Sequence, residues 1–117
     1  MKIKWLEQPE EHDYPAAQSY LGLLSARPEL IVENLRNAKV VYFEAKDIFR
    51  ASGLSLFGIS NSHVKKDIKK IKKGIALSPL LLVRDKVSRK VVIADGYHRL
   101  CAIYTISEDI SIPCKIV

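Results

Sequence analysis

Hydrophobic residues near the end of the chain form two short, nearly continuous runs. Residues 79–84 read PLLLVR and residues 90–94 read KVVIA, and the residues between them, DKVSR, are mostly polar. Short apolar runs bounded by turn residues predict β-strands, and a short polar connection predicts a hairpin. Because nearly every position in the two runs is apolar, we expect this hairpin to be covered on both faces.

The segment after the hairpin predicts a helix and a closing strand. A strand break at Asp95 and Gly96 is followed by apolar residues at helical spacing over residues 97–106. Residues 112–117, IPCKIV, are again mostly apolar and predict the closing strand.

Two helices are predicted at the start of the chain. Over residues 13–24, Asp13 can cap a helix and Pro15 fits its first turn, and a second helix runs from Pro28 to residue 38. The apolar face of the first helix consists of Ala17, Tyr20, Leu21 and Leu24. We expect residues 1–38 to form a helical pair that packs onto the rest of the protein.

The middle of the chain predicts a strand, a helix and a loop. Residues 39–44 are β-branched and aromatic, and residues 45–52 favour a helix that Gly53 can end. Residues 54–61 have no clean period, so they form either a binding loop or a plain surface loop.

A lysine-rich helix is predicted from Asn61 or Ser62 to Lys73, with Gly74 as its stop. Its expected buried stripe is Val64, Ile68, Ile71 and Ile75. Residues 65–73 contain six Lys and one Asp, a net +5 out of +6 for the whole chain. No Arg or aromatic residue is interleaved with these lysines, so the pattern favours a solvated amphipathic helix over a nucleic-acid surface.

Composition indicates one compact domain over residues 1–117 rather than a disordered chain, because 48% of the residues are apolar and 27% are charged. The alternation of helices and strands predicts the α/β (α+β) class. No run resembles a signal peptide or a membrane span, so we expect a cytoplasmic protein without membrane contact. Cys101 and Cys114 are accordingly interpreted as reduced thiols.

The junction between the last hairpin strand and its helix carries the clearest chemistry. Gly96 permits a sharp turn, and the unpaired N–H groups of the first helical turn form an anion site. His98 and Arg99 add donors, and Asp95 could hold a metal ion or orient a hydroxyl group. Tyr97 is either a wall of this pocket or packed against the hairpin. The equally weighted alternative is an Asp cap followed by a surface Arg.

The segments IALSPLLLVRD, KVVIADGYHRLCAIY and ISIPCKIV resemble the fold shared by the ParB N-terminal domain and sulfiredoxin. The resemblance covers about residues 68–117, with weaker agreement over 39–52, and residues 1–38 have no recognised counterpart. It implies a small mixed sheet with flanking helices, to which the N-terminal helical pair is added. It also implies that Gly96, His98 and Arg99 bind phosphate groups, with Tyr97 in the same site.

Within this superfamily the DGYHR turn is most similar to the DGHHR turn of free-serine kinases. Sulfiredoxins have their catalytic Cys where this chain has Tyr97, and ParB proteins have Glu-Arg-Arg in the turn. The kinases use an upstream Glu as the base, whereas the corresponding segment here, LFGISNSHVKK, has no carboxylate before Asp67. The candidates to replace that base are Glu44, Asp47, His63 and Asp95.

These observations predict a protein that binds a nucleotide or a phosphorylated small molecule, with ATP, ADP or CTP and Mg²⁺ as candidate ligands. Phosphoryl transfer from ATP or ADP to a small hydroxyl compound is a further option, with Asp95 and His98 as catalytic residues and Asp95 as the metal ligand. Two alternatives stay open. One is a DNA-associated, nuclease-like module that uses the lysine-rich helix, and the other is a protein-interaction module with a vestigial pocket.

Overall fold

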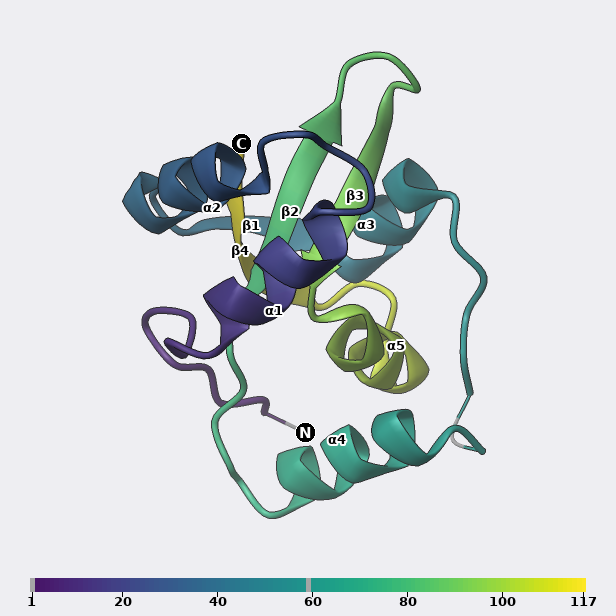
Figure 1. The fold of residues 1–117 in the computed structure, drawn as a ribbon. Coiled ribbons are helices and arrows are strands. Elements are labelled where there is room, and N and C mark those ends of the chain that lie inside the picture. Colours follow the sequence, from purple (N-terminus) through teal and green to yellow (C-terminus); the bar gives the residue numbers. More distant parts are fainter. Residues whose placement is uncertain (1, 59) are drawn as a thin grey trace.

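The computed structural model describes residues 2–58 and 60–117, which form a mixed α+β fold (Figure 1). In chain order the described elements are α1 (Asp13–Leu21), α2 (Pro28–Asn37), β1 (Val41–Glu44), α3 (Ala45–Ser52), α4 (Ser62–Lys72), β2 (Leu80–Asp85), β3 (Lys90–Asp95), α5 (Tyr97–Ile106) and β4 (Ser111–Ile116). The expected fold class is therefore confirmed.

The strands form one mixed sheet in the order β1-β4-β2-β3. β2 and β3 form the predicted antiparallel hairpin, with Asp85 opposite Lys90 next to the turn. β4 pairs parallel with β2 and antiparallel with β1, so the last strand lies in the interior of the sheet.

Helices cover both faces of this sheet. α1 and α2 pack against one face through Leu81 and Ala94, and α1 crosses in front of the strands in Figure 1. Leu80, Leu82 and Ile93 point to the other face, where they join a core with α3, α4 and α5. Because side chains alternate along a strand, three consecutive buried leucines in β2 require cover on both sides, as the apolar run predicted.

The first helix differs from its predicted form. α1 ends at Leu21, and the Leu23 and Leu24 amides bond carbonyls only three residues back, so residues 22–24 form turns. Leu24 and Tyr20, both expected on the buried face, are exposed because the helix ends early and its core face is narrower. Asp13 does not cap α1. It lies inside the first turn, where its side chain is 4% exposed.

The other helices agree with the pattern more closely. α3 has the predicted bounds and ends at Gly53 in the left-handed conformation. The Asn61 side chain caps α4 by accepting from the His63 and Val64 amides, although Ile75, expected in the buried stripe, lies beyond the helix end and is exposed. β1 starts two residues later than the predicted strand.

Cys101 and Cys114 are buried, unpaired thiols, as predicted. Within residues 2–58 and 60–117, no helix combines the length and the apolar character that a membrane crossing needs.

Candidate functional site

The turn before α5 requires a glycine. Gly96 has φ +106°, a conformation that other residues rarely adopt, and a Cβ atom there would lie 2.8 Å from both Leu80 Cγ and Arg99 Nη2. The first intrahelical bond runs from the Leu100 amide to the Gly96 carbonyl, and no side chain in the described part of the chain caps the helix. The first-turn amides of α5 are therefore open to a ligand.

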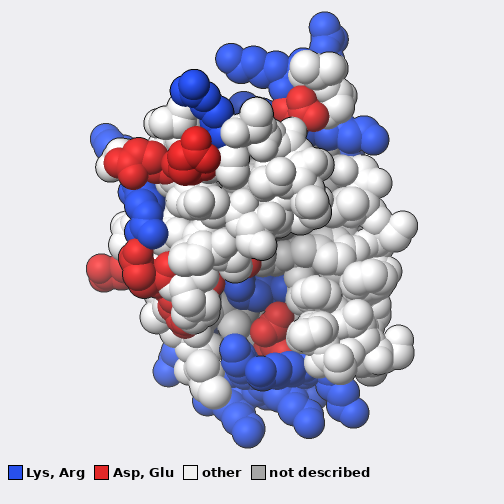
Figure 2. Space-filling model, viewed as in Figure 1, with Lys and Arg blue, Asp and Glu red and all other residues white. Residues whose placement is uncertain are grey.

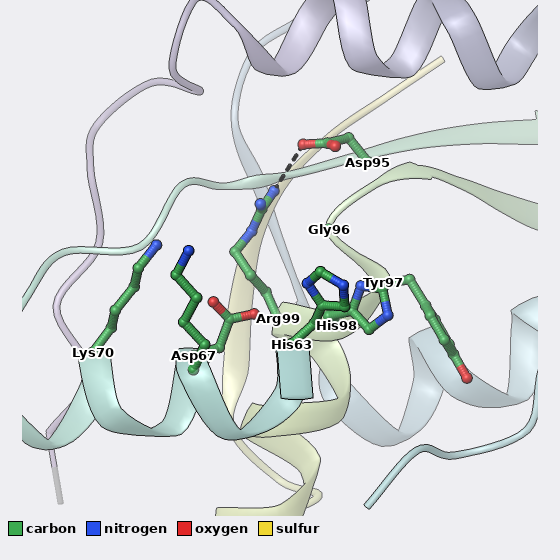
Figure 3. A pocket seen from close by; sticks show the side chains of 9 residues that line it. His63, Asp67, Lys70, Asp95, Gly96, Tyr97, His98 and Arg99 are labelled. Carbon is green, nitrogen blue, oxygen red and sulfur yellow. Dashed lines mark hydrogen bonds and ion pairs between the residues drawn. The ribbon is translucent and has the colours of Figure 1, made fainter. Parts of the chain in front are cut away.

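A pocket of about 200 Å³ lies at this open helix end, between α5 and α4 (Figure 3). The turn contributes Asp95, Gly96, Tyr97, His98 and Arg99, so all five predicted site residues line one pocket. α4 contributes His63, Lys66, Asp67 and Lys70. Counted from His63, the other three residues follow at i+3, i+4 and i+7, which places them on one face of the helix.

Arg99 is held in place from the side of the sheet. Its Nη2 atom lies 3.1 Å from Asp95 Oδ2 and 3.4 Å from the Pro79 carbonyl oxygen. Its Nε atom is buried without a hydrogen-bond partner among the described residues. The Nη2 group of the guanidinium is therefore already hydrogen-bonded, whereas its Nε group can still donate to a ligand.

Asp95 faces a second carboxylate as well as Arg99. Burial raises the pKa of Asp95, the Arg99 charge opposes that rise, and the neighbouring Asp13 carboxylate on α1 adds to it. Asp13 in turn accepts hydrogen bonds from the Ser78 hydroxyl and the Glu10 amide. Asp95 thus belongs to a small buried network that links α1 to the pocket.

The pairing of Asp95 with Arg99 makes Asp95 a poor ligand for Mg²⁺. Mg²⁺ is commonly held by one or two carboxylates together with substrate phosphates and water. Asp95, the predicted ligand, is paired with Arg99. In the described parts of the chain, no group of three or more His, Cys, Asp or Glu side chains is arranged to hold a metal ion. Asp67 is the carboxylate beside the lysines of the pocket.

Two imidazoles meet at the mouth of the pocket. The ring centroids of His63 and His98 are 4.7 Å apart, with an angle of 34° between the planes. Burial and the nearby His63 lower the pKa of His98, against the opposing effect of Asp67. His98 is therefore neutral at pH 7 and can accept or donate a proton as its surroundings change.

The carboxylate of Asp67 lines the pocket, although Asp67 was not among the residues predicted as the base. Burial raises the pKa of Asp67, against the opposing effects of Arg99, Lys70, His98 and His63, which line the same pocket. Its i, i+4 spacing from His63 was the available signal, but only the packing of α4 on α5 brings it to the turn.

The other candidates for the base lie outside this pocket. Glu44 pairs with Lys46, with 3.3 Å between the Lys46 Nζ and Glu44 Oε2 atoms. Asp47 lines a separate apolar cavity with Ile48 and Leu82.

Tyr97 points away from Asp67 and Lys70 in Figure 3. Its hydroxyl group donates to the Ser55 carbonyl, and its ring meets Phe57 edge-on at 5.4 Å. Burial raises the pKa of Tyr97 to about 12. These contacts join the loop after α3 to the pocket wall, and Tyr97 also packs against the core that contains Leu80, Leu82 and Ile93 of the hairpin.

Positive charge surrounds the pocket. Figure 2 shows Lys and Arg side chains gathered at the lower end of the molecule, over α4, with acidic atoms visible in the hollow above them. Lys66 and Lys70 line the pocket itself, whereas Lys69 on the same helix does not. The arrangement can attract an anion and offer it backbone and side-chain donors at one point.

Comparison of the chain with protein-family models, with curated proteins and with solved structures finds no match.

Proposed function

We propose that this protein binds the phosphate groups of a nucleotide or a phosphorylated small molecule in the pocket between α4 and α5, in the manner of the ParB and sulfiredoxin superfamily. The observation that carries the proposal is the uncapped start of α5 at Gly96, which opens into the same pocket as Lys66, Lys70 and Arg99. Backbone amides at a helix start and flexible ammonium groups are common phosphate ligands.

The charge balance of the pocket supports an anionic ligand. Its three cationic side chains, Lys66, Lys70 and Arg99, face two carboxylates, and Asp95 is already paired with Arg99. Burial raises the pKa of Asp67 and of Asp95, so both carboxylates are held less readily in the charged form than exposed ones.

A thermal-shift panel of ATP, ADP, CTP, GTP and pyrophosphate tests the proposal, with and without Mg²⁺. A ligand at 100 times its Kd stabilises the folded state by about 2.7 kcal/mol. For a domain of this size that is a rise in Tm on the order of 10 °C. The absence of any shift at millimolar ligand would remove the proposal.

Matched lysine variants locate the binding site. Lys66→Ala and Lys70→Ala each remove a charge that lines the pocket, and we expect each to weaken binding about 5-fold. Lys69→Ala makes the same change on the same helix outside the pocket and is expected to have little effect. Equal losses in all three variants would instead indicate binding to the whole lysine-rich face of α4, as the DNA-associated alternative requires.

Phosphoryl transfer to a small hydroxyl acceptor is the second candidate function, and Asp67 is the observation that favours it. A carboxylate beside a phosphate site can take the acceptor's hydroxyl proton while the terminal phosphoryl group moves to that oxygen and the shortened nucleotide leaves. Phosphorus NMR of the protein with ATP or ADP, Mg²⁺ and a pool of hydroxyl metabolites would detect the product. Asp67→Asn should abolish the product and retain nucleotide binding.

The same assay tests the two catalytic residues predicted from the sequence. If Asp95→Asn and His98→Asn keep full transfer activity, those roles are wrong. If no acceptor is phosphorylated, binding alone remains as the function.

A further inference from the structure

A second, larger hollow adjoins the phosphate pocket on the other side of the Gly96 turn. Its volume is about 710 Å³, and it lies between α1, the loop after α3 and the end of β3. Apolar and aromatic side chains dominate its walls, among them Ala16, Tyr20, Leu54, Phe57, Ile93 and Tyr97. Asp95, Gly96, Tyr97 and His98 line both cavities, so the two adjoin at this turn.

The sizes of the two cavities suggest that each would hold a different part of one ligand. Pockets that enclose a whole small molecule have volumes of about 300–1,000 Å³. The cationic pocket, at about 200 Å³, is below this range and suits only the charged end of a ligand. The adjoining hollow is large enough for the remainder, and its lining requires that remainder to be largely apolar or aromatic.

The aromatic side chains around the hollow are arranged as a partly open stack. The Phe57 ring is nearly parallel to that of His98, with centroids 6.0 Å apart, and meets Tyr97 edge-on. Phe57 is 43% exposed and Tyr20, across the hollow on α1, is 45% exposed. Exposed aromatic faces beside a phosphate site are surfaces on which planar bases stack.

We infer that the hollow between α1 and the loop after α3 binds the base of a nucleoside phosphate whose phosphates occupy the cationic pocket. This inference rests on the proposed phosphate binding and narrows it, because it selects a nucleotide over a small phosphorylated metabolite. It also assigns a role in ligand binding to α1, through Ala16 and Tyr20, and to the loop, through Leu54 and Phe57.

Calorimetric titration with four probes tests the inference. The probes are ADP, pyrophosphate, ribose 5-phosphate and adenosine, which separate the base, the phosphates and the sugar. We expect ADP to bind at least about 10-fold more tightly than pyrophosphate or ribose 5-phosphate, because only ADP fills both cavities. Equal affinity for ADP and pyrophosphate would overturn the inference and leave phosphate binding intact. Failure of both to bind would remove the proposed function as well.

Aromatic variants then place the base. Stacking on one aromatic side chain changes affinity by about 5- to 150-fold, so Phe57→Ala and Tyr20→Ala should each weaken ADP binding by at least about 5-fold. Pyrophosphate binding should stay unchanged, which separates loss of a stacking surface from a distorted turn. Tyr42→Ala is the matched control, because Tyr42 is an exposed aromatic residue on β1 that lines neither cavity. If ADP binds as tightly to both variants as to the unaltered protein, the base lies elsewhere and the inference is wrong.

Discussion

The guanidinium group of Arg99 lies against the carboxylate of Asp95, with 3.1 Å between Nη2 and Oδ2. Both side chains are less than one-fifth exposed, at 17% and 19%. The pair therefore lies in the wall of the pocket between α4 and α5, where an anionic ligand would compete with Asp95 for Arg99.

Asp95→Asn should strengthen phosphate binding in the absence of metal. The change removes a negative charge next to the pocket and releases Arg99 toward the ligand. Charges about 7 Å apart in a water-like medium interact by about 0.6 kcal/mol, so we expect affinity for pyrophosphate to rise about 3-fold or more. Calorimetric titration of the two proteins measures the change. Weaker binding by Asp95→Asn would show that Asp95 helps to present Arg99 instead of competing for it.

Anion affinity should increase as the pH falls below 6.5. The pKa of His98 is lowered, so the group is neutral at pH 7 and gains its charge only in more acid solution. An anion in the pocket favours the charged imidazole, so binding takes up a proton and becomes tighter as the pH decreases. Sulfate is the suitable probe, because it does not titrate in this range.

His98→Asn should flatten this pH profile between pH 5.5 and 7. His12→Asn is the matched control, because His12 has a 76% exposed side chain and does not line the pocket. An unchanged profile in His98→Asn would show that His98 does not take up the proton.

Gly96→Ala should destabilise the fold and abolish phosphate binding. The new methyl group would meet Leu80 and Arg99 at 2.8 Å, in a backbone conformation that alanine rarely adopts. Strain and overpacking together predict a loss of about 2–5 kcal/mol in the free energy of unfolding, measured by urea denaturation. Gly58→Ala is the control, because a Cβ atom there would have no neighbour within 4 Å among the described residues that Gly58 does not adjoin in the chain. A stable Gly96→Ala protein would contradict the turn geometry.

Ser78→Ala should loosen the attachment of α1 to the sheet. The Ser78 hydroxyl donates to the buried Asp13 carboxylate and accepts from the Glu10 amide. Losing both bonds leaves buried polar groups unsatisfied, which costs about 1–3 kcal/mol in unfolding experiments. Ser88→Ala removes a similar hydroxyl–carboxylate bond to Asp85 in the exposed hairpin turn, and there we expect a change below about 0.5 kcal/mol. Equal effects of the two changes would argue against a structural role for the Asp13 network.

Local patterns were sufficient to predict the half of the site that is continuous in sequence. The hairpin, the strand break at Gly96 and the start of α5 all depend on residues within a few positions of one another. Turn chemistry and apolar period specify such features, so residues 95–99 were predicted to meet at one point, and they do line one pocket.

The half of the site on α4 could not be predicted in the same way. The pattern of α4 shows which face is buried, but not that the edge of this face, with His63, Asp67 and Lys70, lies against the turn at Gly96. That placement depends on tertiary packing of α4 on α5. Asp13 was misassigned as a cap for the same reason, because its partner Ser78 is 65 residues away.

The interior position of β4 has a consequence for how the chain is made. Until residues Ser111–Ile116 have been synthesised, β1 has no strand to pair with and β2 has only β3. The first amides of α3 also lack their partners until this region is made, because the Ala45 and Lys46 amides donate to the Ile110 and Glu108 carbonyls. Completion of the sheet therefore follows synthesis of β4. A product that terminates before residue 111 exposes the unpaired edges of β1 and β2, which are templates for aggregation.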